Sequence, residues 1–232
     1  MIVKYINCHV KPALKSTFSE GQRCWQRTAE SDGFIAQIGG WQDDSAIILA
    51  LWERKESVEH FMQLSHDAIA EDANQQDSYN SLEVDYLQQV LDIPGHHSAL
   101  LATRGSATSS PTSLTAPDQA LAAELMKSAQ FIGITQCNVT ADKVTDFIQQ
   151  QINLWNPAMA AVTGMLGGML LRSSSKGNPF VVITYWLTEA SHQHYMQHVY
   201  LDIQAIANQK SLTEHVQDHQ LKVEPHWRFA HP

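Results

Sequence analysis

An internal repeat constrains the fold of this chain more than any other feature of its sequence. The segment WERKESVEHFMQLSHDAIAEDANQ (Trp52–Gln75) recurs 134 positions later as WLTEASHQHYMQHVYLDIQAIANQ (Trp186–Gln209), and nine of the 24 aligned positions are identical. A repeat of this kind indicates that one structural unit occurs twice. The chain of 232 residues then divides into two similar domains of roughly a hundred residues each.

Both halves predict the same order of secondary structure. In the first half, a strand-like run (Ile2–Val10) precedes a stretch with helical spacing, and two apolar runs joined by a polar turn then predict a hairpin. A second helix and an alternating strand (Leu82–Leu87) complete the unit. The second half repeats the order from Phe131–Val139 to Leu221–Phe229, where Pro225 predicts an edge or a break. This β-α-β-β-α-β order is typical of the ferredoxin-like fold.

The repeat predicts an α+β fold class with two tandem ferredoxin-like units, residues 1–91 and 129–232. Between them, residues 92–128 contain SATSSPTSLTAP, which predicts a Ser/Thr/Pro-rich linker, followed by a short helical stretch. Two helices on one face of a four-stranded sheet leave its other face bare. We therefore expect the two sheets to pair as an intramolecular dimeric α/β barrel, a pseudo-dimer within one chain. Two independent domains are the alternative, and a further homodimer is compatible with either.

Composition narrows the class of partner and the compartment. The net charge of −9 argues against a nucleic-acid partner, because such proteins carry a basic face. The sequence has no apolar run of the roughly 20 residues that span a bilayer, and its N-terminus lacks the pattern of a secretory signal. Three cysteines without a Cys-x-x-Cys motif predict neither a disulfide framework nor a zinc site. We expect a cytoplasmic protein. The predicted fold also leads us to expect a small, largely apolar or aromatic ligand in a pocket between the sheet and the helices of the first half.

Three stretches of the first half resemble a known family. GFIAQIGGW, AIILALWERKESVEHFMQLSHDAI and SYNSLEVDYL are similar to the YdbC-like bacterial proteins of unknown function. These belong to the dimeric α/β-barrel superfamily, together with the antibiotic-biosynthesis monooxygenases and the haem-degrading monooxygenases. The resemblance extends over residues 1–90, and over 129–229 it depends mainly on the repeat. It implies the fold, and for an enzyme it implies a cofactor-independent monooxygenase; it does not fix a function.

The first strand carries two candidate polar residues. Asn7 and His9 lie on one face near its C-terminal end, together with Val3 and Tyr5. In the haem-degrading relatives an asparagine near this point of the strand contacts the iron-bound ligand, so the resemblance implies a ligand-binding role for Asn7. The alternative is that both side chains extend into solvent before the strand ends.

The second helix carries a His-Asp pair. Its apolar direction centres near Val58 and Ile69, which places His66 at the border of the buried face and Asp67, like His60, on the solvent side. The second copy has Tyr200 and Leu201 where the first has this pair. A site that uses the pair would therefore occur once per chain, in the first half. Neutral drift of a solvent-facing pair is the alternative explanation.

These residues suggest a mechanism for an oxygenase. His66 or His9 would remove a proton from a phenol or quinol, Asn7 would orient the substrate, and the resulting anion would react with oxygen. Trp25, Trp41 and Asp67 are candidates for the ligand-binding surface, although Trp25 is matched by Trp155 and packing alone explains it. A non-catalytic binding or assembly module is the competing hypothesis, and haem binding is the third.

The sequence predicts no metal and no cofactor. The resemblance would require a haem-ligating histidine near Glu71 and a tryptophan at Phe61, and neither is present. The pairs His194/His198 and His215/His219 have i, i+4 spacing, but no third metal ligand is fixed by the sequence. The two Gly-Gly pairs, at residues 39–40 and 167–168, lack the phosphate-loop signature and predict strand kinks or bulges.

Overall fold

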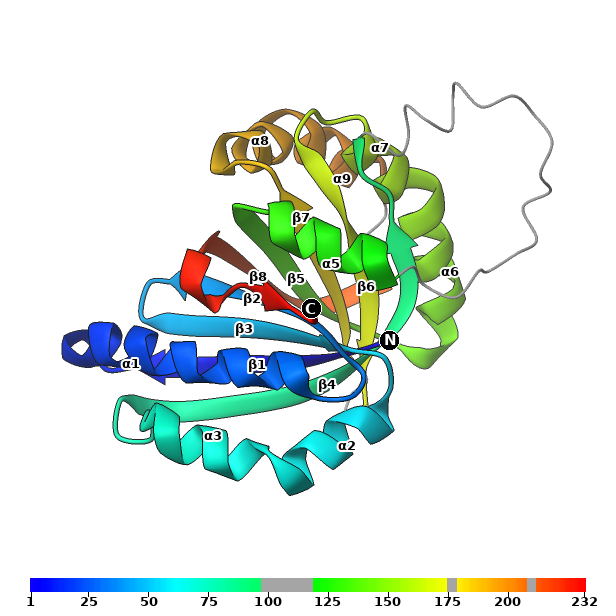
Figure 1. Ribbon diagram of the computed structural model, residues 1–232. Coiled ribbons are helices and arrows are strands. Elements are labelled where there is room, and N and C mark those ends of the chain that lie inside the picture. The colour runs from blue at the N-terminus through cyan, green and yellow to red at the C-terminus, as the bar shows by residue number, and fades with distance from the viewer. Residues whose placement is uncertain (97–118, 175–178, 208–211) are drawn as a thin grey trace. The chain divides into compact units, whose positions relative to one another are not determined.

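The computed structural model describes residues 1–96, 119–174, 179–207 and 212–232. They form two compact units (Figure 1). The first unit comprises Met1–Gln88, Gln119–Lys127 and Leu221–Pro232, and the rest of the described chain forms the second. Most of the predicted linker, residues 97–118, lies outside the described residues. The predicted short helix that follows it is present as α5 (Gln119–Ser128).

The first unit is a four-stranded antiparallel sheet with helices on one face. Its main strands and helices are β1 (Ile2–Val10), α1 (Lys15–Gly21), β2 (Phe34–Gln42), β3 (Ser45–Trp52), α2 (Lys55–Leu64), α3 (His66–Ala73) and β4 (Tyr79–Ile93). Short elements complete it: the 3₁₀ helices η1 (Pro12–Leu14), η2 (Gln22–Glu30) and η6 (Pro225–Trp227), and strand β9 (Phe229–Ala230). The strand order is β4-β1-β3-β2, and the far edge of β2 pairs with β9 and with the last residues of β8 (Thr213–Val223).

Alternation along β1 decides which side chains face the helices of the first unit. Ile2 packs in one cluster with Val58 and Phe61 of α2, and Cys8 packs in a second cluster with Phe18 of α1. Even-numbered residues of β1 therefore face α1, α2 and α3, which Figure 1 shows beside strands β1, β3 and β4. Odd-numbered residues of the same strand point to the other face of the sheet.

The second unit repeats this order. Its elements are β5 (Phe131–Val139), η3 (Ala141–Lys143), α6 (Val144–Gln150), η4 (Gln151–Trp155), α7 (Asn156–Ala160), β6 (Met165–Ser173), β7 (Phe180–Trp186), α8 (Glu189–His194), η5 (Tyr195–Tyr200), α9 (Leu201–Ile206) and most of β8. The strand order is β6-β7-β5-β8, and the end of β4 is the neighbour of β6. The predicted α+β class with two tandem ferredoxin-like units is therefore confirmed.

Several predicted elements need correction. The last strand of the second half does not run over Leu221–Phe229: β8 ends at Val223, and Pro225 begins the 3₁₀ helix η6 because it lacks a backbone N–H. The helix predicted after β1 is interrupted at Gly21. A Cβ on Gly21 would lie 2.4 Å from the carbonyl oxygen of Ala73, so glycine permits this close contact with the end of α3.

The two Gly-Gly pairs differ in what they do. The register of β6 shifts between Met165 and Gly167, and Gly167 has a φ of 142°, as the predicted bulge requires. At Gly40 the register of β2 continues without a shift. There a Cβ would lie 2.1 Å from the carbonyl oxygen of Lys222, so this glycine allows β8 to approach.

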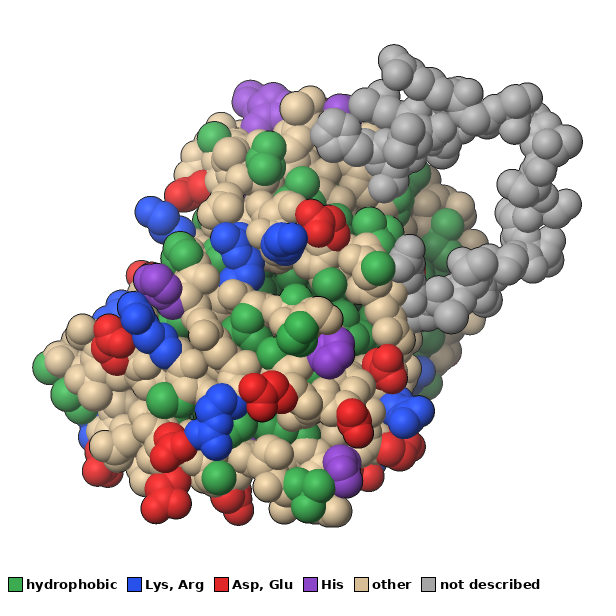
Figure 2. Space-filling model, in the orientation of Figure 1, with side chains coloured by type: hydrophobic (Ala, Val, Ile, Leu, Met, Phe, Trp, Pro, Cys, Tyr) green, Lys and Arg blue, Asp and Glu red, His purple; other side chains and the backbone are tan. Residues whose placement is uncertain are grey.

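Over the first unit, the face in view in Figure 2 has Lys and Arg side chains interspersed with Asp and Glu rather than gathered in one basic patch. Within the described ranges, no helix combines the length and the apolar character needed to cross a bilayer.

Candidate functional site

A cavity of about 120 Å³ lies in the first unit between the sheet and its helices. Its strand side is formed by the helix-facing residues of β1 and β3, among them Lys4, Ile6, Cys8, Ala50 and Trp52. Its helix side comes from α1, η2, α2 and α3 and includes Phe18, Trp25, Thr28, Phe61 and His66. Apolar cavities of roughly 150 Å³ hold a benzene ring, so this volume suits a single aromatic ring.

Aromatic side chains form much of the cavity wall and are held against one another. The rings of Trp52 and Phe61 lie 5.1 Å apart, and the ring of His66 lies 5.3 Å from Trp25 and 5.9 Å from Phe61. Flat, polarisable walls of this kind favour an aromatic ligand, which can stack or make edge contacts.

Gln75 fixes the orientation of Trp25 in this wall. Its side-chain amide donates to the carbonyl oxygen of Phe18 over 2.6 Å and accepts from the indole N–H of Trp25 over 2.9 Å. Gln75 is itself buried. Trp25 therefore presents an apolar ring to the cavity with its one polar atom already satisfied.

His66 lies at the edge of the cavity with one ring nitrogen paired. It is the first residue of α3, after the helix breaks at Ser65, and its Nδ1 lies 2.9 Å from Oδ1 of Asp67. Asp67 is 97% exposed, so the pair connects the cavity to solvent. A carboxylate at Nδ1 favours the tautomer that carries its proton there, which leaves Nε2 free to accept a proton.

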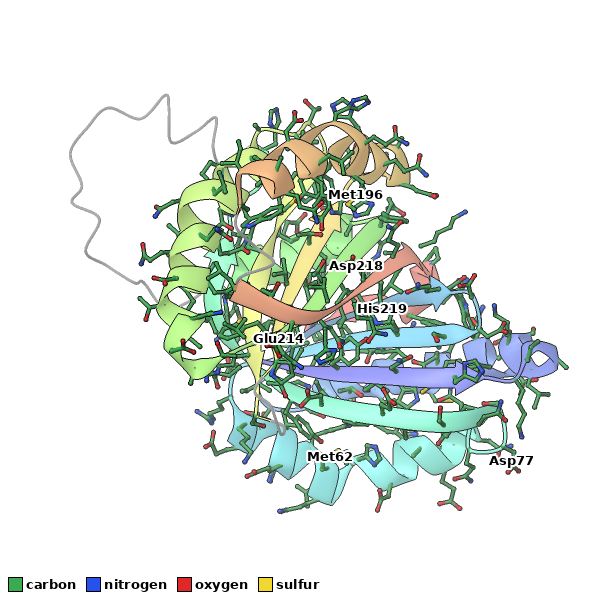
Figure 3. The ribbon with its side chains drawn as sticks, turned by 180° about the vertical axis from the view of Figure 1, so that it is seen from behind. Met62, Asp77, Met196, Glu214, Asp218 and His219 are labelled. Carbon is green, nitrogen blue, oxygen red and sulfur yellow. The ribbon has the colours of Figure 1, made fainter. Side chains whose placement is uncertain are left out.

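Lys4 is the cavity residue that sequence reasoning missed. Its side chain comes from β1, is only 6% exposed, and donates from Nζ to Sδ of Met62 over 3.2 Å; Met62 is labelled on α2 in Figure 3. Nζ also lies 5.9 Å from the ring centroid of Phe61. Burial lowers the pKa of the Lys4 ammonium to about 8. The available signal was a lysine in the otherwise apolar set Ile2, Ile6, Cys8.

Two further polar atoms of the cavity lack partners in the described part of the chain. These are the indole N–H of Trp52 and the hydroxyl of Thr28, both on buried residues. Buried polar groups are normally hydrogen-bonded. By contrast, the thiol of Cys8 is not a reactive candidate, because burial raises its pKa to about 12.

The structure brings together only some of the residues that the sequence singled out. His66 and Trp25 line the cavity, and Asp67 reaches it through His66. Asn7 and His9 lie on the opposite face of β1, with the Asn7 side-chain oxygen buried and His9 exposed. They do not join His66 at this cavity, because alternation along the strand separates odd from even positions.

Trp41 lies beside the cavity rather than in its wall. Its ring centroid is 5.8 Å from that of Phe18 and 5.0 Å from that of Trp227. The contact with Trp227 comes from η6 at the end of the chain, so Trp41 supports Phe18, which does line the cavity.

A second hollow of the first unit is larger, about 380 Å³, but its character is different. It lies between η2 and the α2–α3 helices, and many of its lining residues are charged or polar, such as Arg27, Glu30, Asp32 and His60. Arg27 forms an exposed ion pair with Asp72. This open, solvated hollow lacks the aromatic walls and buried donors of the smaller cavity.

No metal centre is formed by the described residues. They contain no group of three or more His, Cys, Asp or Glu side chains placed to hold an ion. His194 and His198 do stack, with ring centroids 4.8 Å apart. The pair His215/His219 lies on strand β8 instead of a helical turn, where i and i+4 are far apart.

Comparison with known proteins identifies the family. A family model described as a domain of unknown function (DUF4937) matches residues 2–87. The uncharacterized protein YdbC of Bacillus subtilis is 33% identical over 105 residues, which cover 43% of this chain and 87% of YdbC. The chain belongs to the YdbC-like family. Every residue that lines the aromatic cavity of this YdbC-like chain lies within the matched range.

Solved structures show the same fold over nearly the whole YdbC-like chain. Two proteins described as "putative monooxygenase" match 96% of it: one from Fusobacterium nucleatum (TM-score 0.66, 10% identity, 91% of that chain) and one from Lactobacillus acidophilus (0.64, 12%, 93%). An anthrone oxidase-like protein also covers 96% of this chain and 90% of its own, with a TM-score of 0.62 and 11% identity. At these identities the likeness is one of fold.

The second unit of the YdbC-like chain has a smaller hollow in the equivalent place. It measures about 60 Å³ and is lined by Gly133, Thr184, His192, Tyr195, Met196, Tyr200 and Asp218, among others; Met196 and Asp218 are labelled in Figure 3. Nδ1 of the buried His192 has no hydrogen-bond partner among the described residues, but Thr184 is fully paired. Thr184 accepts from the indole N–H of Trp186 over 2.9 Å and donates to the carbonyl oxygen of Gly133 over 3.2 Å.

Proposed function

We propose that the first unit of this YdbC-like chain binds a small aromatic molecule in the cavity between β1, β3 and the helices. We further propose that it acts there as a cofactor-independent monooxygenase on a phenol or quinol. One observation carries the proposal: a cavity of single-ring volume with aromatic walls has His66 at its edge, and Asp67 holds the imidazole.

The proposed reaction begins with a proton transfer. Nε2 of His66 removes the proton of the substrate hydroxyl, and Asp67 stabilises the imidazolium that forms. The electron pair stays on the substrate, where it is delocalised from the oxygen to a ring carbon. That carbon adds molecular oxygen to form a hydroperoxide, and loss of water yields a quinone. A phenol plus O₂ thus gives a quinone plus water, with all electrons supplied by the substrate.

The fold of the related structures is compatible with this chemistry. Two of these proteins are described as a "putative monooxygenase" and one as an anthrone oxidase-like protein. Haem, the third hypothesis from the sequence, is not favoured, because the haem-ligating histidine that the resemblance requires near Glu71 is absent. A binding module without catalysis would use the same cavity, and the experiment below separates it from an oxygenase.

The test is oxygen consumption with hydroquinone as the substrate, measured with an oxygen electrode. We expect His66→Ala to lower the enzyme-dependent rate by about 10²-fold or more, because general-base catalysis contributes that much. His60→Ala is the matched control, since His60 is an exposed histidine outside the cavity wall. His9→Ala should also retain the rate, because His9 is on the other face of β1.

Three outcomes distinguish the hypotheses. Loss of the rate in His9→Ala but not in His66→Ala would move the base to the opposite face of the sheet. Binding of hydroquinone without oxygen consumption by the wild-type protein would leave a binding module. If hydroquinone neither binds nor is oxidised, the proposed function is wrong for single-ring substrates.

A further inference from the structure

Three buried polar groups converge on the aromatic cavity without a conventional partner among the described residues. Nζ of Lys4 donates to the sulfur of Met62 and lies over the Phe61 ring, 5.9 Å from its centroid, and the Trp52 indole N–H and the Thr28 hydroxyl make no hydrogen bond to a described residue. Each of these residues is at most 6% exposed. Two of the three groups, the ammonium and the indole N–H, can only donate. The cavity therefore presents two groups that can only donate, the Lys4 ammonium and the Trp52 indole N–H, and neither is paired with an oxygen acceptor of the described residues.

The lysine and the tryptophan are neighbours on the sheet. Trp52 of β3 pairs with Ile2 of β1, and Lys4 is the next residue of β1 on the same face. Side chains related by this diagonal lie about 7–8 Å apart at their bases, within reach of long and aromatic groups. Both residues line the cavity. One ligand atom can therefore meet both donors.

No carboxylate of the described residues forms an ion pair with Lys4, and Glu59 of α2 is paired with Lys55 instead. Its cross-strand partners are Ala50 on β3 and Tyr86 on β4, and α2 contributes Phe61 and Met62. Tyr86 stays a neutral phenol, because its pKa is raised by burial and then by Glu59. A buried ammonium is normally paired with an anion.

We propose that Lys4 and the indole N–H of Trp52 form an anion subsite that receives the ionised oxygen of an aromatic ligand, so the ligand class is aromatic compounds with an acidic hydroxyl. The inference rests on the proposed function, whose cavity supplies the ring-binding walls. In that reaction His66 takes the hydroxyl proton, while the electron pair stays on the oxygen that the two donors hold. A ring of the same size without an ionisable hydroxyl leaves both donors unpaired and binds more weakly.

The probes that test this are 4-nitrophenol and nitrobenzene, two single-ring molecules that differ by one acidic hydroxyl. Ionised 4-nitrophenol absorbs visible light, so its protonation state on the protein is read directly, and the affinities of both are measured by calorimetry. We expect the wild-type protein to bind 4-nitrophenol roughly tenfold or more tightly than nitrobenzene, as a charge-assisted hydrogen bond provides. We also expect bound 4-nitrophenol to ionise at a lower pH than the free probe.

Lys4→Met is the decisive variant, because methionine keeps the apolar stem and removes the charge. It should bind the two probes with similar affinity and should not lower the ionisation pH of 4-nitrophenol. Lys55→Met is the matched control: it removes one positive charge from an exposed position on α2 and should leave the preference intact. The ionisation of the probe on the wild-type protein tests the subsite independently of how any variant folds.

The two proposals fail in different ways. If neither probe binds the wild-type protein, the ring-binding cavity is wrong and the subsite falls with it. If both probes bind equally and 4-nitrophenol ionises as it does in water, the cavity stands and the anion subsite is overturned. A preference that survives in Lys4→Met would also overturn the assignment to this residue.

Discussion

The two repeats differ in whether the indole N–H of their matched tryptophan, Trp52 or Trp186, has a hydrogen-bond acceptor. At equivalent places on their sheets, the first unit has Lys4 paired with Ala50, and the second has Gly133 paired with Thr184. Thr184 supplies the acceptor for the indole N–H of Trp186, whereas Ala50 leaves the equivalent Trp52 unpaired. The same tryptophan is thus satisfied in one copy and available in the other.

The space between these strands and the helices is also smaller in the second unit than in the first. In the second unit His192 fills it: a Cβ on Gly133 would lie 2.9 Å from Nε2 of His192. In the first unit the residue at the repeat-equivalent helix position is Val58, and the cavity is about twice as large. The second unit closes its site with its own side chains. The first keeps unpaired donors and a larger cavity, and the proposed ligand site depends on both.

The largest expected effect of a single substitution on stability is a gain from Lys4→Met. Burial lowers the Lys4 pKa from 10.5 to about 8, a penalty of up to about 3 kcal/mol when the amine is protonated. The variant should be more stable than the wild type at pH 7 by up to that amount, measured by urea unfolding without ligand. Lys55→Met should change stability little, because its ion pair with Glu59 is exposed.

The stability gain of Lys4→Met over the wild type should depend on pH. Between pH 8 and 10.5 the unfolded chain holds the lysine proton and the folded chain does not, so wild-type stability rises with pH through this window. The advantage of Lys4→Met should therefore shrink as pH rises above 8. An advantage that is constant with pH would mean that better packing, and not removal of a buried charge, explains the gain.

In the second unit, a buried histidine should lower the free energy of unfolding by a similar amount, but only at acidic pH. Burial lowers the pKa of His192 from 6.5 to about 4, and Asp218 opposes this shift. Below pH 6.5 the unfolded chain takes up a proton that the folded chain refuses, so stability falls by up to about 3 kcal/mol as pH drops towards 4. His192→Val, which copies the first unit, should remove this part of the acid sensitivity, whereas exposed His194→Val should not.

Features that depend on residues close together in the sequence could be predicted, and features that depend on distant residues could not. The bounds of β1 and β5 match their predicted ranges, because buried strands carry a strong apolar signal. At Gly21 the first helix changes from α1 to the 3₁₀ helix η2, and the close approach of Ala73 to Gly21 could not be predicted, because the two residues are distant in sequence. His66 was found because helical projection placed it at the border of the apolar face.

Lys4 was missed for a different physical reason. Both faces of β1 are largely apolar, so the strand alone does not reveal which face the helices cover. Asn7 and His9 drew attention because polar residues suggest chemistry, yet they lie on the face away from the helices. The functional signal was the lone lysine among Ile2, Ile6 and Cys8, and its meaning depends on a burial that the sequence does not state.

A smaller effect is expected from removing the acceptor in the second unit. Thr184→Val keeps the shape of the side chain but leaves the Trp186 indole N–H and the Gly133 carbonyl without their hydroxyl partner. An unsatisfied buried group costs about 1–3 kcal/mol, and the loss should appear in the urea midpoint. Thr135→Val provides a control, since its hydrogen bond to Asp218 is exposed. If Thr184→Val and Thr135→Val lower the urea midpoint equally, the buried Thr184 hydrogen bonds contribute no more to stability than an exposed one.

The smallest effect should come from the reverse exchange, Ala50→Thr, which gives the first unit the acceptor of the second. The new hydroxyl should take the Trp52 N–H and add about 1 kcal/mol of stability. Because Ala50 lines the cavity beside Lys4, the same change should weaken 4-nitrophenol binding several-fold, while Lys4 still favours it over nitrobenzene. If Ala50→Thr is more stable but binds 4-nitrophenol with unchanged affinity, Trp52 is not part of the anion subsite and Lys4 is its donor. If Ala50→Thr instead raises the free energy of unfolding and weakens 4-nitrophenol binding, the indole N–H of Trp52 takes part in binding the ligand.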